Sequence, residues 1–510
     1  MNHNRFTTAV SRPQFEPPRS VAFFLAGLMI FVALVSWFIF LRQSLRLDEA
    51  QSLWQTSHNP AKILNILAQD VHLPLYHLIL HYWTLYLGNS VAIARALSLI
   101  FFLLSIPALY ALGRRLFNWR ISLFATVIFS ISPFMNWYGN EVRMYSLLTL
   151  ATILSQYFFV RIYQDRDGDS WFGYFVVALA GIFIHYFFFF VLLVQALFFL
   201  THQDLFPPKS LRRFIAIAAV IVLVFSPWLW YVRTLGTVSN EVPLLATPNT
   251  VNVFNTFSEF LFGFQNDHLN TVLVSLWPIS VLLGFLALRH NKRVSPEVVY
   301  IMMSILIPIA AAFTVSVTVR PLFVSRYLIL TIPSMYLLIG WVFSTYPQTL
   351  GRFFRTLLII IMFAGLAVES ANPNTPVKEN YESAARFLEA NAAPQDIIIL
   401  SAPFTVYPVE YYYRGATEIS TLPIWNRFVT GPIPAFDEAT LPDEVAALKD
   451  RHDKAYLLLS YDQGYEEKIR LYFDSNFHRL DVKNFSPGLN LYVYQLRYDV
   501  PILQYVISRP

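Results

Sequence analysis

The feature that most constrains this chain is a series of long apolar segments along its first 371 residues. The first of them, residues 21–41, contains 21 nearly uncharged residues, and about 20 apolar residues are enough for a helix to cross a hydrocarbon core of about 30 Å. Of all 510 residues, 56% are hydrophobic and 14% are charged, whereas an average soluble chain carries about 25% charged residues. We therefore expect a mainly α-helical, polytopic integral membrane protein.

Basic residues predict the orientation of the chain. Arg5, Arg12 and Arg19 precede the first segment, which is longer than a signal-peptide core, so we interpret it as a retained span with a cytoplasmic N-terminus. The run 74–87 has only 14 residues and two histidines, which is short for a span, so we expect interfacial helices in the first outer loop. With that choice, five loops rich in arginine and lysine all face the cytoplasm, as the positive-inside rule predicts.

This pattern predicts a transmembrane helical bundle of about eleven spans in the cell membrane, the plasma or inner membrane. The expected spans cover residues 21–41, 90–112, 120–138, 145–163, 171–186, 187–202, 211–231, 269–288, 298–317, 327–345 and 356–371. Because eleven is odd, the part of the chain that follows the last span is expected outside the cytoplasm.

The composition changes abruptly beyond Glu369 into that of an ordinary soluble protein. We predict two domains, a transmembrane domain at residues 1–371 and a soluble extracytoplasmic domain at residues 372–510. Hydrophobic periodicity in the second domain predicts helices and strands in alternation, which is typical of a small α/β domain. The helices are expected at 382–390 and 466–473, and the strands at 396–400, 456–460 and 491–495.

The composition also excludes several classes of site. The chain has no cysteine, which rules out disulfides, thiolate nucleophiles and cysteine-based metal sites. With 17 glycines and no phosphate-cradling glycine loop, a glycine-rich nucleotide-sugar site is not expected. The net charge of +5 is small for this length and includes no basic arm, so we do not expect nucleic-acid binding.

Carboxylate and histidine side chains of the membrane part gather on its predicted outer face. Asp48 and Glu49 follow the first span, and Asp70 and His72 close the first outer loop just before Pro74. Helix capping by the aspartates and a solvated interfacial histidine explain these residues equally well. Carboxylates near a hydrocarbon boundary are costly, however, and such residues are usually functional.

Two further groups lie on the same predicted face. The short turn between the third and fourth spans carries Glu141, Arg143 and Tyr145, and Glu141 and Tyr145 would share a helix face because they are four residues apart. A local Glu/Arg pair at the membrane boundary is the simpler alternative. His185 lies in the turn between two aromatic spans, and Arg326-Tyr327 opens the tenth span. Each of these two sites is also compatible with an interfacial anchor.

Together these residues resemble the pattern of the membrane-embedded C-type glycosyltransferases that use polyprenyl-phosphate sugars, close to the protein O-mannosyltransferases and the lipid A aminoarabinose transferases. The resemblance covers about residues 20–345. Such transferases commonly show a paired proline where this chain has Leu73-Pro74. The segments that carry the resemblance are Asp48-Glu49, residues 72–76, residues 132–145, His185-Tyr186 and Arg326-Tyr327.

The resemblance implies transfer of a sugar from a polyprenyl-phosphate donor to an extracytoplasmic lipid, glycan or protein. It implies that Asp48 activates the acceptor, and one carboxylate base is enough because the phosphate leaving group needs little protonation. Glu49 would orient Asp48 or hold a cation, and Glu141 is the third candidate catalytic residue. Arg143 and Arg326 suit the donor phosphate, since a guanidinium binds phosphate oxygens in pairs.

The remaining candidates are assigned to substrate binding or to a metal ion. The substrate-binding set consists of Asp70, His72, Arg143, Tyr145, His185, Arg326 and Tyr327. Related transferases differ in their use of metal, so a divalent ion held by Asp70, His72, Glu141 or His185 is left open. Two other functions are also open: a transporter or flippase of a lipid-linked intermediate, and a non-catalytic scaffold or receptor. A transporter would place its ionisable groups near the bilayer midplane, whereas these gather at one face.

Overall fold

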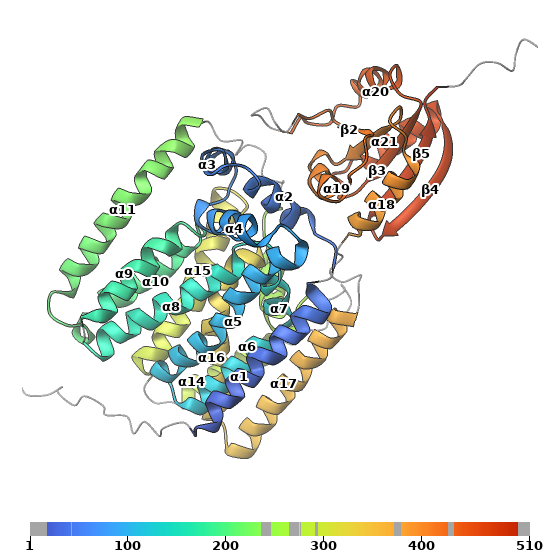
Figure 1. Ribbon diagram of the computed structural model, residues 1–510. Coiled ribbons are helices and arrows are strands. Elements are labelled where there is room, and N and C mark those ends of the chain that lie inside the picture. The colour runs from blue at the N-terminus through green and yellow to red at the C-terminus, as the bar shows by residue number, and fades with distance from the viewer. Residues whose placement is uncertain are drawn as a thin grey trace, which may run out of the picture. The chain divides into compact units, whose positions relative to one another are not determined.

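The computed structural model describes residues 18–41, 43–166, 168–235, 246–264, 275, 277–290, 294–371, 379–426 and 433–497 (Figure 1). Their contacts divide the chain into two compact units. Unit 1 draws on Met1–Phe40, Ala96–Pro227 and Leu245–Ala371, and unit 2 on Leu41–Arg95, Trp228–Leu244 and Asn372–Pro510. The contacts therefore group the predicted first outer loop with the predicted soluble domain, and the division of the chain at residue 371 stays a prediction.

Unit 1 is a bundle of apolar helices. The ring centroids of Phe31 on α1 (Ser20–Val35) and Phe363 on α17 (Gln348–Ala371) lie 6.2 Å apart, and these two helices run side by side in Figure 1. The helices of the bundle, two of which run on into unit 2, are α1 (Ser20–Val35), continued by a π-helical turn (Ser36–Phe40), α5 (Val91–Leu116), α6 (Trp119–Ile131), α7 (Pro133–Gly139), α8 (Tyr145–Gln164), α9 (Asp169–Ile182), α10 (Phe188–Thr201), η2 (Gln203–Leu205), α11 (Ser210–Leu235), α12 (Thr250–Phe262), α14 (Trp277–His290), α15 (Pro296–Thr318), η4 (Ser325–Thr331), α16 (Ile332–Thr345) and α17 (Gln348–Ala371).

The membrane-spanning bundle is confirmed. Among the described residues, seven helices are long and apolar enough to cross a membrane, and the pair α6 and α7, bent by 62°, makes an eighth if it forms one span. Every predicted span overlaps a described helix. The exact number of eleven stays a prediction, because α9, α10 and α14 have only 14 residues each within the described part of the chain.

Aromatic side chains fill the interior of the bundle. Phe159 of α8 is fully buried, and its ring lies 5.4 Å from that of Tyr300 on α15 and 6.1 Å from that of Phe198 on α10. Each such ring pair adds about 0.5–1.5 kcal/mol to the burial of its apolar surface. Part of the large phenylalanine content thus serves helix packing.

The first part of unit 2 consists of three short helices, α2 (Leu47–Thr56), α3 (Pro60–Gln69) and α4 (Pro74–Leu87). Helix α4 begins at Pro74, because proline suits the first helical position, where no intrahelical hydrogen bond is lost. Its 14 residues extend over about 21 Å, which is less than the hydrocarbon core of about 30 Å. The run 74–87 is therefore a separate short helix within the predicted first outer loop.

The second part of unit 2 is a small α/β domain with a five-stranded sheet in the order β2-β1-β3-β5-β4. Strand β1 pairs in parallel with β2 and β3, and β5 pairs antiparallel with β3 and β4.

The five predicted elements are all present. The sequence did not predict β2, β4, α19 and α20. The elements are α18 (Tyr381–Asn391), β1 (Ile397–Ser401), η5 (Pro403–Thr405), α19 (Val406–Tyr412), β2 (Glu418–Thr421), α20 (Leu441–Lys449), β3 (Lys454–Leu459), α21 (Glu466–Asn476), β4 (His478–Ser486) and β5 (Leu489–Gln495).

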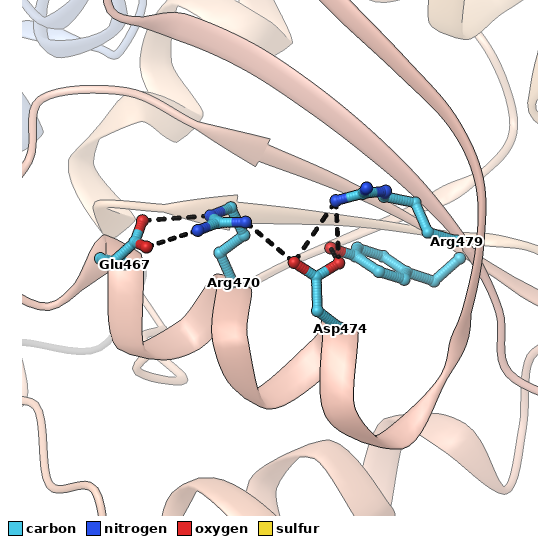
Figure 2. A network of polar contacts seen from close by, with 5 residues as sticks. Glu467, Arg470, Asp474 and Arg479 are labelled. Carbon is cyan, nitrogen blue, oxygen red and sulfur yellow. Dashed lines mark hydrogen bonds and ion pairs between the residues drawn. The ribbon is translucent and has the colours of Figure 1, made fainter.

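A polar network attaches α21 to the antiparallel side of this sheet (Figure 2). Arg470 pairs with Glu467 and, at 2.9 Å, with Asp474. The Asp474 carboxylate also pairs with the guanidinium of Arg479 at 3.1 Å and accepts a hydrogen bond from the hydroxyl of Tyr494 at 3.0 Å. Exposed ion pairs stabilise a fold by only about 0.2–1 kcal/mol each, so the network mainly fixes how α21 lies on β4 and β5.

Helix α19 connects the two parts of unit 2. The backbone N–H of Leu45, just before α2, donates to the Tyr412 hydroxyl at 2.9 Å. The rings of Trp54 on α2 and Tyr407 on α19 lie 5.0 Å apart, and the Tyr411 hydroxyl donates to the carbonyl of Asn89 at 2.7 Å. The α/β domain is thus fixed on the segment that carries Asp48.

Candidate functional site

In unit 1, the turn between α7 and α8 carries Glu141 and Arg143. Ser132 caps α7 by accepting the N–H of Met135 at 3.2 Å, and Pro133 occupies the first helical position. The helix ends at Gly139, where an added Cβ would lie 2.5 Å from the Phe102 ring. The chain then turns through residues 140–144 before α8 begins at Tyr145.

This turn is buried rather than lying at a surface. Glu141 is 2% exposed and Arg143 is 4% exposed. The carbonyl of Arg143 accepts the hydroxyl of Ser98 at 3.3 Å, and its N–H donates to the carbonyl of Glu141 at 2.7 Å. Because the helix begins only at Tyr145, the expectation that Glu141 shares a helix face with Tyr145 is wrong. The burial of two charged side chains in an apolar bundle is costly, which favours a functional interpretation.

The predicted residues of unit 1 do come together around Tyr145. The charges of Glu141, Arg143 and Arg326 act on its hydroxyl, as does the Tyr327 phenol. Helix α8 packs against η4, whose first turn carries Arg326 and Tyr327. The guanidinium of Arg326 lies 5.6 Å from the centroid of the Tyr327 ring. Two arginines and a phenol in one poorly solvated place form a suitable site for an anion.

His185 joins the same cluster. It lies in the turn between α9 and α10 and is 8% exposed, with its ring 5.2 Å from that of Tyr327 and 6.4 Å from that of Tyr145. Its Nδ1 accepts the N–H of Phe187 at 3.1 Å. In the neutral ring the proton is therefore on Nε2, which makes Nε2 a hydrogen-bond donor. A donor nitrogen suits a phosphate oxygen better than it suits a metal ion.

Glu259 belongs to the same surroundings, although the sequence did not predict it. It lies on α12, which packs against η4, and the Ser325 side chain lies near its carboxyl. Burial raises the pKa of this carboxyl, and the Ser325 contact partly offsets that effect. The sequence signal was a carboxylate within the amphipathic segment 250–262, which is not a predicted span.

In unit 2, Glu49 and Asp48 have different surroundings although they are neighbours. Glu49 is fully buried and pairs with Arg95, whose Nη2 lies 2.6 Å from Oε2 and whose Nε lies 2.7 Å from Oε1. Arg95 also donates to the carbonyls of Gln43 and Ser44 at 2.6 and 2.9 Å. These are the contacts of an anchor that fixes the start of α2. In the sequence, Arg95 is a lone charge within an apolar run, but it was not among the predicted site residues.

Asp48 lies in the first turn of α2 and is partly exposed. Its charge acts on Glu379 and Tyr461 of the α/β domain, and the charge of Arg46 acts on the same two groups. Because Glu49 is fully buried, Asp48 is the more accessible of these two neighbouring carboxylates. Its predicted role as the base is compatible with this position.

Asp70 and His72 form a hydrogen-bonded pair between α3 and α4. His72 Nδ1 lies 2.9 Å from Asp70 Oδ2, which also accepts the side-chain amide of Gln55 at 2.8 Å. Asp70 Oδ1 accepts the N–H of Val71 at 2.7 Å. With these contacts the carboxylate orients the His72 ring and directs Nε2 away from the pair.

The predicted residues thus form one cluster in unit 1 and two small groups in unit 2. The convergence of all of them in one cavity stays a prediction. Within the described part of the chain, no three His, Asp or Glu side chains are placed to hold one metal ion. A divalent ion at Asp70, His72, Glu141 or His185 also stays a prediction.

Known proteins resemble both the sequence and the fold. Residues 71–231 match a family model described as dolichyl-phosphate-mannose-protein mannosyltransferase. The fold is similar to that of ArnT from Cupriavidus metallidurans in the apo state, with a TM-score of 0.62 and 13% identity over 94% of this chain and 98% of that one. The resemblance to the membrane-embedded C-type glycosyltransferases is confirmed.

Two further solved structures share this fold. ArnT from Cupriavidus metallidurans bound to undecaprenyl phosphate gives a TM-score of 0.58 at 13% identity, over 95% of this chain and 99% of that one. The oligosaccharyltransferase of Archaeoglobus fulgidus, in complex with Zn and sulfate, gives a TM-score of 0.51 at 13% identity, over 91% of this chain and 72% of that one. No curated protein sequence matches the chain significantly.

Proposed function

We propose that this protein transfers a sugar from a polyprenyl-phosphate donor to a hydroxyl-bearing acceptor on the extracytoplasmic side of the membrane. The observation that carries the proposal is the cluster in unit 1 of buried Arg143, Tyr145 and His185 with half-buried Arg326. Two guanidinium groups, a phenol and an imidazole N–H form a donor set that is complementary to a phosphate. The relative solved with undecaprenyl phosphate has the same fold.

The chemistry requires one proton transfer and one exchange of bonds at the sugar. Asp48 removes the proton of the acceptor hydroxyl, whose oxygen attacks the anomeric carbon. The bond between that carbon and the phosphate oxygen breaks, and its electron pair leaves with the polyprenyl phosphate. The arginines stabilise the charge that develops on the phosphate, and Asp48 supplies general-base help that is typically worth about 10²–10⁴ in rate.

The test uses the purified full chain in lipid vesicles with synthetic undecaprenyl phosphates that carry mannose, arabinose or aminoarabinose. Acceptors are lipid A, a serine-containing peptide and an oligosaccharide. We expect release of undecaprenyl phosphate with at least one donor, and a loss of at least about 10²-fold in Asp48→Asn, which keeps the size of the side chain. Asp204→Asn, an exposed change between α10 and α11, is the matched control.

Two outcomes would contradict the proposal. Full turnover by Asp48→Asn would remove Asp48 from the role of base. Movement of intact donor across the vesicle membrane, without cleavage by the wild-type chain, would instead indicate a flippase.

A further inference from the structure

Helix α2 holds the Asp70–His72 pair through two glutamine amides. Gln55 is 1% exposed, and its Nε2 donates to Asp70 Oδ2 at 2.8 Å. Gln51 Nε2 donates to the same oxygen at 3.4 Å, and His72 Nδ1 lies 2.9 Å from it. The carboxylate is therefore held in one orientation between α2 and the residues that precede α4.

Asp48 lies on the same face of α2 as the two amides. It precedes Gln51 by three residues, and Gln55 follows Gln51 by four. Residues at these spacings are neighbours on the surface of a helix. One helix thus positions both the proposed base and, through Asp70, the ring of His72.

The His72 ring is also fixed from a second side. Its centroid lies 5.4 Å from that of His77, and the two rings meet edge-on. His77 is 1% exposed, and its Nδ1 lies 3.2 Å from the carbonyl oxygen of Leu73. Pro74, which begins α4, restricts the backbone of Leu73. The His72 ring, itself 8% exposed, is thus held by the carboxylate and by a buried neighbour.

These contacts determine which nitrogen of the neutral His72 ring carries the proton. Because the Asp70 carboxylate accepts, Nδ1 is the N–H donor and Nε2 keeps its lone pair. Within the part of the chain that the structure describes, no hydrogen-bond partner of Nε2 is present. His185 has the opposite arrangement, since its Nδ1 accepts the N–H of Phe187. His185 therefore suits an oxygen that only accepts, and His72 suits a group that donates.

We propose that His72 binds a hydroxyl of the acceptor through Nε2, and that Asp70 and Gln55 are its positioning residues. The proposal rests on the proposed function, in which Asp48 removes the proton of the attacking hydroxyl. An ionised phosphate offers no hydrogen to Nε2, and the negative charge of Asp70 disfavours a second anion beside the ring. His72 thus serves the acceptor and not the phosphate of the donor.

The first experiment determines the tautomer of His72 without substrate. Nitrogen-15 spectra of the histidine-labelled full chain in lipid vesicles, recorded in alkaline buffer, distinguish a bare ring nitrogen from a protonated one. His72→Gln identifies the signals of His72. We expect a protonated Nδ1 and a bare Nε2 in the wild-type chain, and a mixture of both tautomers in Asp70→Leu. A protonated Nε2 in the wild-type chain would overturn the proposal.

The second experiment measures the affinity for undecaprenyl phosphate by calorimetry in detergent. We expect the same affinity in His72→Ala as in the wild-type chain. A loss of about 10-fold or more, as expected for an arginine that holds the phosphate, would assign His72 to the donor and overturn the proposal.

The third experiment measures the KM and kcat of the transfer. It uses whichever of lipid A, the serine-containing peptide and the oligosaccharide is glycosylated. We expect His72→Ala to raise the KM for the acceptor by about 3- to 10-fold, as for the loss of one hydrogen bond, and to leave the KM for the donor unchanged. His72→Gln, whose side-chain carbonyl can accept a hydrogen bond, should recover part of this loss.

The positioning role of Gln55 is tested by a double-variant cycle. Gln55→Leu removes the 2.8 Å bond to Asp70 and should raise the KM for the acceptor when His72 is present. In the His72→Ala background it should add nothing, because Gln55 acts through the missing ring. A purely structural role would add the same loss in both backgrounds. Gln69→Leu, which removes an amide that bonds Asn65 at 2.8 Å on α3, is the matched control.

The outcomes separate this inference from the proposed function. Turnover with an acceptor KM that is unchanged in His72→Ala would overturn the role of His72 and leave the transferase standing. No cleavage of any donor by the wild-type chain would contradict the transferase, and the acceptor role of His72 with it. The tautomer is measured on the wild-type chain, so the test stays decisive even if His72→Ala fails to fold.

Discussion

Glu49 and Arg95 form an ion pair in which both side chains are fully buried, with 2.6 Å between Oε2 and Nη2. The pair joins the first turn of α2 to the first turns of α5, and Arg95 also holds the two carbonyls that precede α2. Loss of one partner leaves the other charge buried and unpaired. Such losses typically cost about 3–5 kcal/mol.

We therefore predict that Glu49→Gln destabilises the protein far more than it changes the chemistry. The measurement is the midpoint of thermal unfolding of the full chain in detergent, together with donor turnover per folded molecule. Glu382→Gln removes one partner of an exposed pair with Arg386 and should change stability by less than about 1 kcal/mol. A normal melting midpoint with lost turnover would show that Glu49 acts in catalysis.

The double variant Glu49→Leu/Arg95→Met provides a further check of the same pair. It removes both charges, so it should recover part of the stability that Glu49→Gln loses. Recovery should stay incomplete, because the carbonyls of Gln43 and Ser44 lose their donor. If the double variant is less stable than the single one, the two residues are not coupled as a pair.

The sequence predicted those features that depend on local pattern. Apolar runs located the helices of the bundle, and Pro74 marked the start of α4. Strand β4 was missed because it is an exposed edge strand with many polar residues, and β2 has only four residues. The pairing of Glu49 with Arg95 could not be predicted, since it joins residues 46 positions apart and a single sequence carries no information on such contacts.

For the candidate site, most of the residues could be predicted from the sequence, but their burial could not. Most of the residues that gather around Tyr145 were identified from their predicted position at one membrane face, whereas Glu259 was not. The burial of these residues was not predicted, because the turn after Gly139 looks like an ordinary polar loop in the sequence, whereas packing against Phe102 draws it inside.

Glu466 should make the stability of the α/β domain depend on pH. Burial raises the pKa of its carboxyl to about 8, and the nearby charge of Asp462 adds to this effect. A carboxyl whose pKa is raised in the folded state contributes stability below its unfolded pKa and loses that contribution as pH rises toward 8. We expect Glu466→Gln to be more stable than wild type at pH 9 by about 1–2 kcal/mol, after allowance for solvent screening.

The measurement is thermal unfolding of the full chain at pH 5 and pH 9. The difference between variant and wild type should be small at pH 5 and should grow with pH. Glu438→Gln, an exposed change in the same domain, should show no such trend. A constant difference at both pH values would mean that Glu466 is ionised throughout.

The predicted orientation can be tested with single cysteines, since the chain has none. Asp204 lies between α10 and α11, and Ser383 lies on α18; both are exposed. Positive-inside loops predict that Asp204→Cys faces the cytoplasm and Ser383→Cys the opposite side. A membrane-impermeant thiol reagent added to intact cells should therefore label the Ser383→Cys variant and leave the Asp204→Cys variant unlabelled.

The control is permeabilised cells, in which both variants should react. Labelling of both in intact cells would mean that the number of spans between the two positions is even. The first segment to reconsider would then be α14, which lies between the two positions and has 14 residues within the described part of the chain.

The two arginines of the cluster should hold the phosphate of the donor. Arg143 and Arg326 both act on the Tyr145 hydroxyl, and Arg143 is 4% exposed, so a phosphate between them would be poorly solvated. Hydrogen bonds to a charged group contribute about 1.5–3 kcal/mol each, so Arg326→Gln should weaken binding of undecaprenyl phosphate by about 10- to 100-fold. Arg352→Gln, an exposed change at the start of α17, serves as the matched control. The affinity for undecaprenyl phosphate, measured by calorimetry in detergent, should thus fall for Arg143→Gln and Arg326→Gln and stay constant for Arg352→Gln. Equal affinity in all three variants would mean that the phosphate binds elsewhere.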